Sequence, residues 1–402
     1  MRIPRWRVIV ALVLAASLAA VVGIAAYRLV TGGAQAETSA LFYEVADDLI
    51  PGEPGTIIRS ERMFGAPPGS IAWRVVYRST DDAGATIAVS GIVVAPLDYA
   101  SGASRPVLAW AHPTTGSDVS CAPSLSEDPF HLIPGIDEFL EAGYVVAATD
   151  YPGMGVAGEN AYLIGQVEGH SVLDSVRAAE AIPGAHASNE AVIWGFSQGG
   201  QAALFSAQVS ADYAPELAVH GVAVAAPVAD IGVLLTDDID DVSGVTIGSY
   251  AFQSYASHYG PTFAGATLET VLTPEGVAAV PAINDLCLLT DRTQLHQIAE
   301  PLVGTFLAAD PTQTAPWNEL LALNTPDAAG AVPLFIAQGS ADTLVQPAET
   351  AKFAAAACAS GRSVDVVILG GVTHGLAGED SVPQLLDWVS TLGEGAPASK
   401  GC

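Results

Sequence analysis

The stretch that decides the fold of this chain is Ala191-Val192-Ile193-Trp194-Gly195-Phe196-Ser197-Gln198-Gly199-Gly200. Its first four residues form a short apolar run, which is typical of a buried strand. Residues 201–207 contain neither Pro nor Gly and predict a helix. Ser197 then stands at the apex of a sharp turn, a nucleophile elbow, where the flanking residues must be small. The alternative is an ordinary serine in a glycine-rich turn.

The segments around this elbow predict a large α/β domain. An opening β-hairpin is expected from residues 71–79 and 86–95. Further strands are predicted at 106–111, 144–149, 191–194, 219–226, 332–337 and 364–369, and helices between them at 136–142, 171–182, 201–207, 348–357 and 382–392. A hairpin followed by such alternation indicates a mostly parallel central sheet with helices on both faces.

Residues of about 228–325 break this alternation. They contain helix-like stretches at 268–272, 295–307 and 317–323, separated by joints rich in Pro and Gly. The segment is too long for a simple connection between a strand and a helix. We therefore expect a helical cap inserted after the strand that ends near Ala226, because such caps cover active sites. An ordinary structural subdomain is the alternative.

A serine nucleophile needs a general base, and the base needs an acid that orients it. On a sheet of this kind the acid follows the serine along the chain, and the histidine comes last. Asp342 follows the predicted strand at 332–337, and His374 lies in the loop after the strand at 364–369. These two residues are the predicted acid and base. The alternatives are a turn aspartate and a surface loop histidine, and the rival aspartates, which all lie further along the chain, are Asp365, Asp380 and Asp387.

An oxyanion hole requires two backbone N–H donors. The first expected donor is Gln198, directly after the serine, at the N-terminus of the predicted helix. The second is expected in the loop that follows the strand at 106–111. Pro113 has no N–H and is excluded. Thr114 is therefore the predicted donor and Thr115 the second choice, and a plain turn is the alternative.

Residues 1–36 have the features of a targeting segment. Arg2, Arg5 and Arg7 precede an apolar stretch at 8–26, and the motif Ala34-Gln35-Ala36 resembles a cleavage site. We predict a signal peptide cleaved after Ala36. The alternative is an uncleaved N-terminal membrane anchor, because the apolar stretch approaches the roughly 20 residues that span a bilayer. In both cases residues 37–402 form an exported catalytic domain.

Charge and cysteine content narrow the functional classes. The net charge is −29 with only 14 basic residues, so a nucleic-acid partner is not expected. The four cysteines are widely spaced and form no C-x-x-C pair, which argues against a zinc site. Outside the cytoplasm we expect disulfides rather than free thiols, with three pairings open.

Taken together, these segments resemble the fungal and actinobacterial secretory lipase family, the lipase-A type of α/β-hydrolase. The resemblance covers nearly all of the mature chain and rests on residues 48–55, 77–80, 112–116, 121–124, 149–153, 195–200, 339–342 and Cys402. It implies a Ser197–Asp342–His374 triad, a helical cap over the acyl site, and lipase or carboxylesterase activity. With the cysteine spacing, it also favours the pairs Cys121–Cys287 and Cys358–Cys402.

The sequence thus predicts an exported serine hydrolase that cleaves carboxylic esters through an acyl-enzyme, without metal or cofactor. The expected substrate is a neutral acyl ester or lipid, and contact with a lipid interface is compatible with this function. No protein partner is inferred. Two alternatives stay open: an exported serine peptidase or amidase on the same fold, and a catalytically silent envelope binding protein.

Overall fold

The structure is a computed structural model that describes residues 41–97, 104–237, 239–392 and 402. The predicted targeting segment, residues 1–36, lies outside the described residues. The chain divides into two compact units, residues 1–44 and 45–402, and the fold below is that of the second unit. Within the described ranges, no helix is long and apolar enough to cross a membrane.

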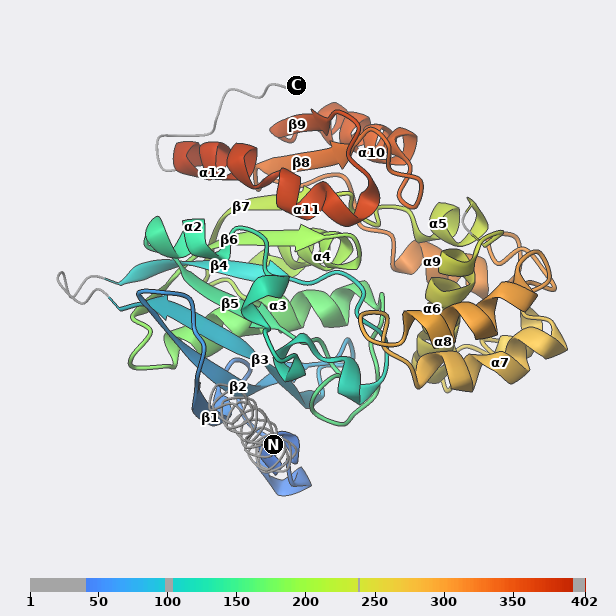
Figure 1. The fold of residues 1–402 in the computed structure, drawn as a ribbon, viewed down its shortest axis with the longest axis horizontal. Helices are drawn as coiled ribbons and strands as arrows, with labels where there is room; N and C mark the ends of the chain where they lie inside the picture. Colours follow the sequence, from blue (N-terminus) through green and yellow to red (C-terminus); the bar gives the residue numbers. More distant parts are fainter. Residues whose placement is uncertain (1–40, 98–103, 238, 393–401) are drawn as a thin grey trace, which may run out of the picture. The chain divides into compact units, whose positions relative to one another are not determined.

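In the described part of the chain, nine strands form one sheet with the order β1-β2-β3-β5-β4-β6-β7-β8-β9 (Figure 1). The strands are β1 Ile57–Met63, β2 Ser70–Thr80, β3 Thr86–Pro96, β4 Arg105–Ala111, β5 Val145–Thr149, β6 Ala187–Phe196, β7 Ala218–Ala225, β8 Leu334–Gly339 and β9 Val364–Leu369. β1 to β3 pair antiparallel, β3 pairs antiparallel with β5, and every pair from β5 to β9 is parallel. The predicted mostly parallel sheet with an opening hairpin is confirmed.

Helices cover both faces of this sheet. One face packs against α3 (Gly165–Glu180), α4 (Gln198–Tyr213) and α10 (Pro347–Ala359). The other packs against α2 (Ile136–Glu141), α11 (Ala377–Asp380) and α12 (Val382–Thr391). Strand β4 shows the alternation directly, because Val107 and Ala109 belong to the first core whereas Leu108 and Trp110 belong to the second.

Helix α3 begins six residues before the predicted start at residue 171. Its first turns contain Gly165, Glu168, Gly169 and His170, which weaken the apolar pattern in the sequence. All four are buried in the fold. A Cβ on Gly169 would lie only 3.0 Å from the backbone nitrogen of Ser206, so the missing side chain lets α3 approach α4 closely. Tertiary packing therefore extends a helix that local pattern places too late.

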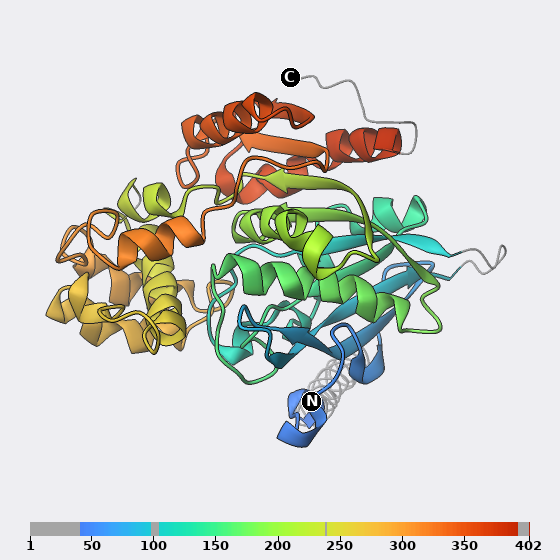
Figure 2. The ribbon, with the colours of Figure 1, turned by 180° about the vertical axis from the view of Figure 1, so that it is seen from behind.

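The segment between β7 and β8 is helical, as Figures 1 and 2 show beside the end of the sheet toward which β6 and β8 point. It contains α5 Ile231–Asp237, α6 Val242–Tyr259, η5 Leu268–Thr270, α7 Pro274–Asn284, α8 Arg292–Ala299, η6 Glu300–Leu302 and α9 Trp317–Leu323. The stretch 317–323 was predicted correctly. The stretch 268–272 forms only a short 3₁₀ turn, and the helix expected at 295–307 stops at Ala299, because Pro301 follows.

Two disulfides close long segments of the chain. Cys121 pairs with Cys287, with the Cα atoms 5.2 Å apart, and so joins the loop after β4 to the helical insertion. Cys358, at the end of α10, pairs with Cys402, with the Cα atoms 5.7 Å apart. These are the pairs that the resemblance favoured.

Candidate active site

Ser197 lies between the end of β6 and the start of α4, with φ of 56° and ψ of −118°. Its backbone is anchored on both sides, because its N–H donates to Ala225 (3.0 Å) and its carbonyl accepts from the N–H of Val228 (3.1 Å). A Cβ on Gly199 would clash with the carbonyl oxygens of Ala111 and His112. A glycine two residues after the serine is therefore a geometric requirement of this turn.

Three residues that are far apart in the sequence meet at this turn. His374 Nε2 lies 2.9 Å from Ser197 Oγ, and His374 Nδ1 lies 2.9 Å from Asp342 Oδ2. They come from the ends of β6, β8 and β9, whose parallel direction brings those ends to one edge of the sheet. The arrangement allows a proton to pass from the serine hydroxyl to the imidazole while the carboxylate orients the ring.

Asp342 is buried and held in one orientation. Its Oδ1 accepts the N–H groups of Leu344 (3.0 Å) and Val345 (2.9 Å), and its Oδ2 accepts the side-chain amide of Gln338 (3.2 Å) as well as His374. These contacts fix the orientation of the side chain and satisfy the oxygen atoms of a buried polar group. The imidazole is fixed on a second side by the ring of Phe196, whose centroid lies 5.1 Å away.

The motifs around His112 and Asp150 form a scaffold beside this centre. The ring nitrogens of His112 face the carbonyl oxygens of Pro113 (2.7 Å) and Asp150 (3.2 Å), and burial lowers the pKa of His112. The carboxylate of Asp150 accepts from the hydroxyl of Ser90 (2.7 Å) and from the N–H (2.9 Å) and hydroxyl of Ser124. These contacts join the segments 112–116, 121–124 and 149–153 in space.

The predicted oxyanion donors lie on neighbouring segments. Gln198 is the first residue of α4, so its N–H has no acceptor within the helix. Thr114 follows the end of β4, and the close approach of Gly199 to Ala111 and His112 brings that loop against α4. The hydroxyl of Thr114 pairs with the hydroxyl of Tyr162 at 2.7 Å. This contact joins the Thr114 loop to the segment that carries Tyr162.

The sequence pattern did not identify Glu168, which lies directly behind the elbow. Its Oε1 accepts the side-chain amide of Gln198 (2.6 Å) and the N–H of Leu163 (3.0 Å). Burial raises the pKa of Glu168 to about 8. The sequence feature that could have identified Glu168 is a carboxylate within a segment of mostly apolar or small residues. Local pattern alone does not distinguish such a buried carboxylate from an exposed one at the start of a helix.

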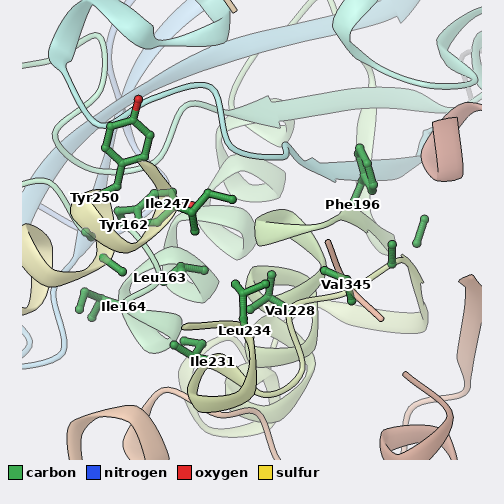
Figure 3. Close-up of a cluster of buried hydrophobic side chains, with 14 of the residues drawn as sticks. Tyr162, Leu163, Ile164, Phe196, Val228, Ile231, Leu234, Ile247, Tyr250 and Val345 are labelled. Carbon is green, nitrogen blue, oxygen red and sulfur yellow. The ribbon is translucent and has the colours of Figure 1, made fainter. Parts of the chain in front are cut away.

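Apolar side chains lie on the segments next to the serine, because Phe196 precedes it and the N–H of Val228 donates to its carbonyl. Figure 3 shows Phe196 and Val345 on one side of Val228 and Leu234, and a group that includes Tyr162 on the other. Leu234 comes from the insertion helix α5 and lines a narrow pocket together with Val228 and Val345; the lining also includes the acidic residues Asp230 and Glu349. No group of three or more His, Cys, Asp or Glu residues in the described ranges is arranged to hold a metal ion.

A family profile described as "Secretory lipase" matches residues 133–401. The chain belongs to the secretory lipase family. Lipase A of Arthroderma benhamiae is 30% identical over 214 residues, which cover 47% of this chain and 44% of that protein. A probable inactive lipase of Mycobacterium tuberculosis is 29% identical over 197 residues, 44% of this chain and 43% of that protein.

The chain therefore spans less than half the length of these two curated relatives. Among solved structures, the closed state of Candida antarctica lipase A superimposes with a TM-score of 0.70 at 18% identity, over 90% of this chain and 87% of that one. At this identity the superposition shows that the two proteins share the α/β-hydrolase fold.

Proposed function

We propose that this secretory lipase family member is an exported serine hydrolase that cleaves carboxylic esters, as a lipase or carboxylesterase. The observation that carries the proposal is the continuous contact from Ser197 through His374 to Asp342, with both distances at 2.9 Å. Family membership and the lipase A relative support the same chemistry.

In the proposed reaction, His374 Nε2 takes the proton of Ser197 while Oγ attacks the ester carbonyl. The backbone N–H groups of Gln198 and Thr114 stabilise the oxyanion, and Asp342 holds His374 in the reactive tautomer. The alcohol leaves with the proton from His374, and water then hydrolyses the acyl-enzyme by the same route. The chain's own residues supply each step, so no metal or cofactor is required.

The proposed substrate is a neutral acyl ester or lipid. Apolar residues next to the elbow, such as Phe196 and Val228, suit an acyl chain, and the helices of residues 231–323 are proposed to act as a cap over it. The excess of negative charge disfavours anionic substrates. Export, with residues 1–36 as the targeting segment, is supported by the family and by two disulfides, which persist in oxidising compartments.

The test is hydrolysis of p-nitrophenyl esters of two to sixteen carbons by protein lacking residues 1–36, beside Ser197→Ala. Ser390→Ala, an exposed serine on α12, is the matched control. Activity that rises with chain length and disappears only in Ser197→Ala supports a lipase, and activity on the shortest esters alone indicates a carboxylesterase. Labelling by a fluorophosphonate without ester hydrolysis would favour a peptidase or amidase, and the absence of both would favour a silent binding protein.

A further inference from the structure

Glu168 occupies an unusual place for a carboxyl group. It lies in the first turn of α3, and it is fully buried at 0% exposure. Oε1 receives both of its hydrogen bonds, from Gln198 and Leu163. Oε2 is buried and has no hydrogen-bond partner in the described part of the chain. A buried carboxylate oxygen without a partner is costly, so the side chain is expected to have a role beyond packing.

We propose that Glu168 is a positioning residue for the oxyanion hole, and that it performs this role with a neutral carboxyl group. This inference rests on the proposed ester hydrolysis at Ser197. Glu168 acts through other residues and touches no reacting atom.

The contacts connect Glu168 to both proposed oxyanion donors. The bond from Gln198 Nε2 tethers the residue whose backbone N–H is the first donor. The bond from the Leu163 N–H fixes the residue next to Tyr162. The hydroxyl of Tyr162 in turn pairs with the hydroxyl of Thr114, the residue proposed as the second donor. One carboxyl group therefore links the segments that carry the two donors. A shift of about 1 Å between donors can lower a rate by roughly two orders of magnitude.

The surroundings of Glu168 favour its neutral form. The titratable groups that face it are Tyr151, Tyr162 and Tyr255, and burial raises the pKa of each phenol, which keeps it neutral. In the described part of the chain, no Lys, Arg or His side chain forms an ion pair with Glu168. Burial accordingly raises the pKa of Glu168 to about 8. Ionisation would place a negative charge behind a site where another negative charge develops, and the two would repel.

The test is the pH dependence of kcat and KM for the full chain and its Glu168→Gln and Glu168→Leu variants. In the wild type, kcat is expected to fall by about tenfold as the carboxyl ionises above pH 8. Glu168→Gln keeps the acceptor but cannot ionise, so this alkaline fall should disappear. Glu168→Leu lacks the tether and should lower kcat by roughly 10- to 100-fold at every pH, with little change in KM. Glu319→Gln, an exposed glutamate on α9, is the matched control.

If Glu168 had a purely structural role, as a cap for the first turn of α3, its substitution would change stability. The fall of kcat above pH 8 would then stay the same. The inference is overturned if Glu168→Gln shows the same fall of kcat above pH 8 as the wild type, or if Glu168→Leu leaves kcat of the folded protein unchanged. Carbon-13 NMR of the glutamate carboxyls provides a readout independent of activity: a Glu168 signal that titrates in the usual glutamate range also overturns it. Failure of the proposed function is seen separately, as the absence of Ser197-dependent hydrolysis and fluorophosphonate labelling in the wild type.

Discussion

Gly199→Ala tests whether the close contact between α4 and the end of β4 sets the oxyanion geometry. The new Cβ would clash with the carbonyl oxygen of Ala111 and would lie 2.7 Å from that of His112. The second distance alone falls about 0.7 Å short of the 3.4 Å at which ordinary contact begins. Helix α4 and the loop after β4 must therefore separate by at least this amount.

The two proposed oxyanion donors lie on the segments that would separate, because Gln198 begins α4 and Thr114 follows His112. Since a misplacement of about 1 Å can cost two orders of magnitude, kcat should fall roughly 30- to 100-fold, with a smaller effect on KM. Overpacking should also lower the free energy of unfolding by about 1–3 kcal/mol.

The assay is steady-state hydrolysis of a p-nitrophenyl ester, with kcat normalised to the fraction that retains native near-UV circular dichroism. Gly370→Ala is the matched control, because a Cβ there meets no atom within 4 Å and the backbone has no left-handed φ. We expect that control to retain wild-type kcat. A folded Gly199→Ala protein with nearly wild-type kcat would refute the reasoning, since the donors would then tolerate the displacement.

Further predictions follow from the same geometry. Asp342→Asn should lower kcat by about 10³- to 10⁴-fold in steady-state ester hydrolysis while the protein stays folded, because the amide no longer holds the reactive tautomer of His374. Cys402→Ser removes a cross-link between positions 44 residues apart and should lower the free energy of unfolding by about 3–4 kcal/mol in urea denaturation. Because burial raises the pKa of Glu168 to about 8, the folded protein binds a proton that the unfolded chain releases at lower pH. Stability should therefore fall as the pH rises from about 5 to 8, and Glu168→Gln should show a shallower slope.

The sheet was predictable because its strands are short, strongly apolar and bounded by turns. The segment 191–194 is one example, and it extends in the structure to Ala187–Phe196 once β4 and β7 pair with it. The meeting of Ser197, Asp342 and His374 was predictable for a related reason. It depends on chain order and on position after a strand, and both can be read from the sequence, whereas the catalytic roles of the three residues stay predictions.

The helical insertion was less predictable. Helix α6, Val242–Tyr259, is rich in Ser, Gly and Thr, which are weak helix formers, and no helix was predicted there. In the fold its buried face includes Tyr250, Phe252 and Tyr255. Phe252 lies edge to face against Trp317 with the ring centroids 5.2 Å apart. Contacts between segments distant in the sequence stabilise this helix, so local propensity underestimates it.

A relative described as a probable inactive lipase raises the question of which observation speaks for catalysis in this chain. The order of serine, aspartate and histidine does not answer it, because a silent protein can retain all three. Two features at the elbow and behind it are more informative. Each lowers the stability of the fold, so each is expected to serve a function. Ser197 has a φ of 56°, a backbone strain that costs of the order of 1–3 kcal/mol. Glu168 is buried behind it with one oxygen unpaired. Ligand binding alone requires neither feature, whereas the proposed acyl transfer needs a nucleophile held at a sharp turn and fixed oxyanion donors.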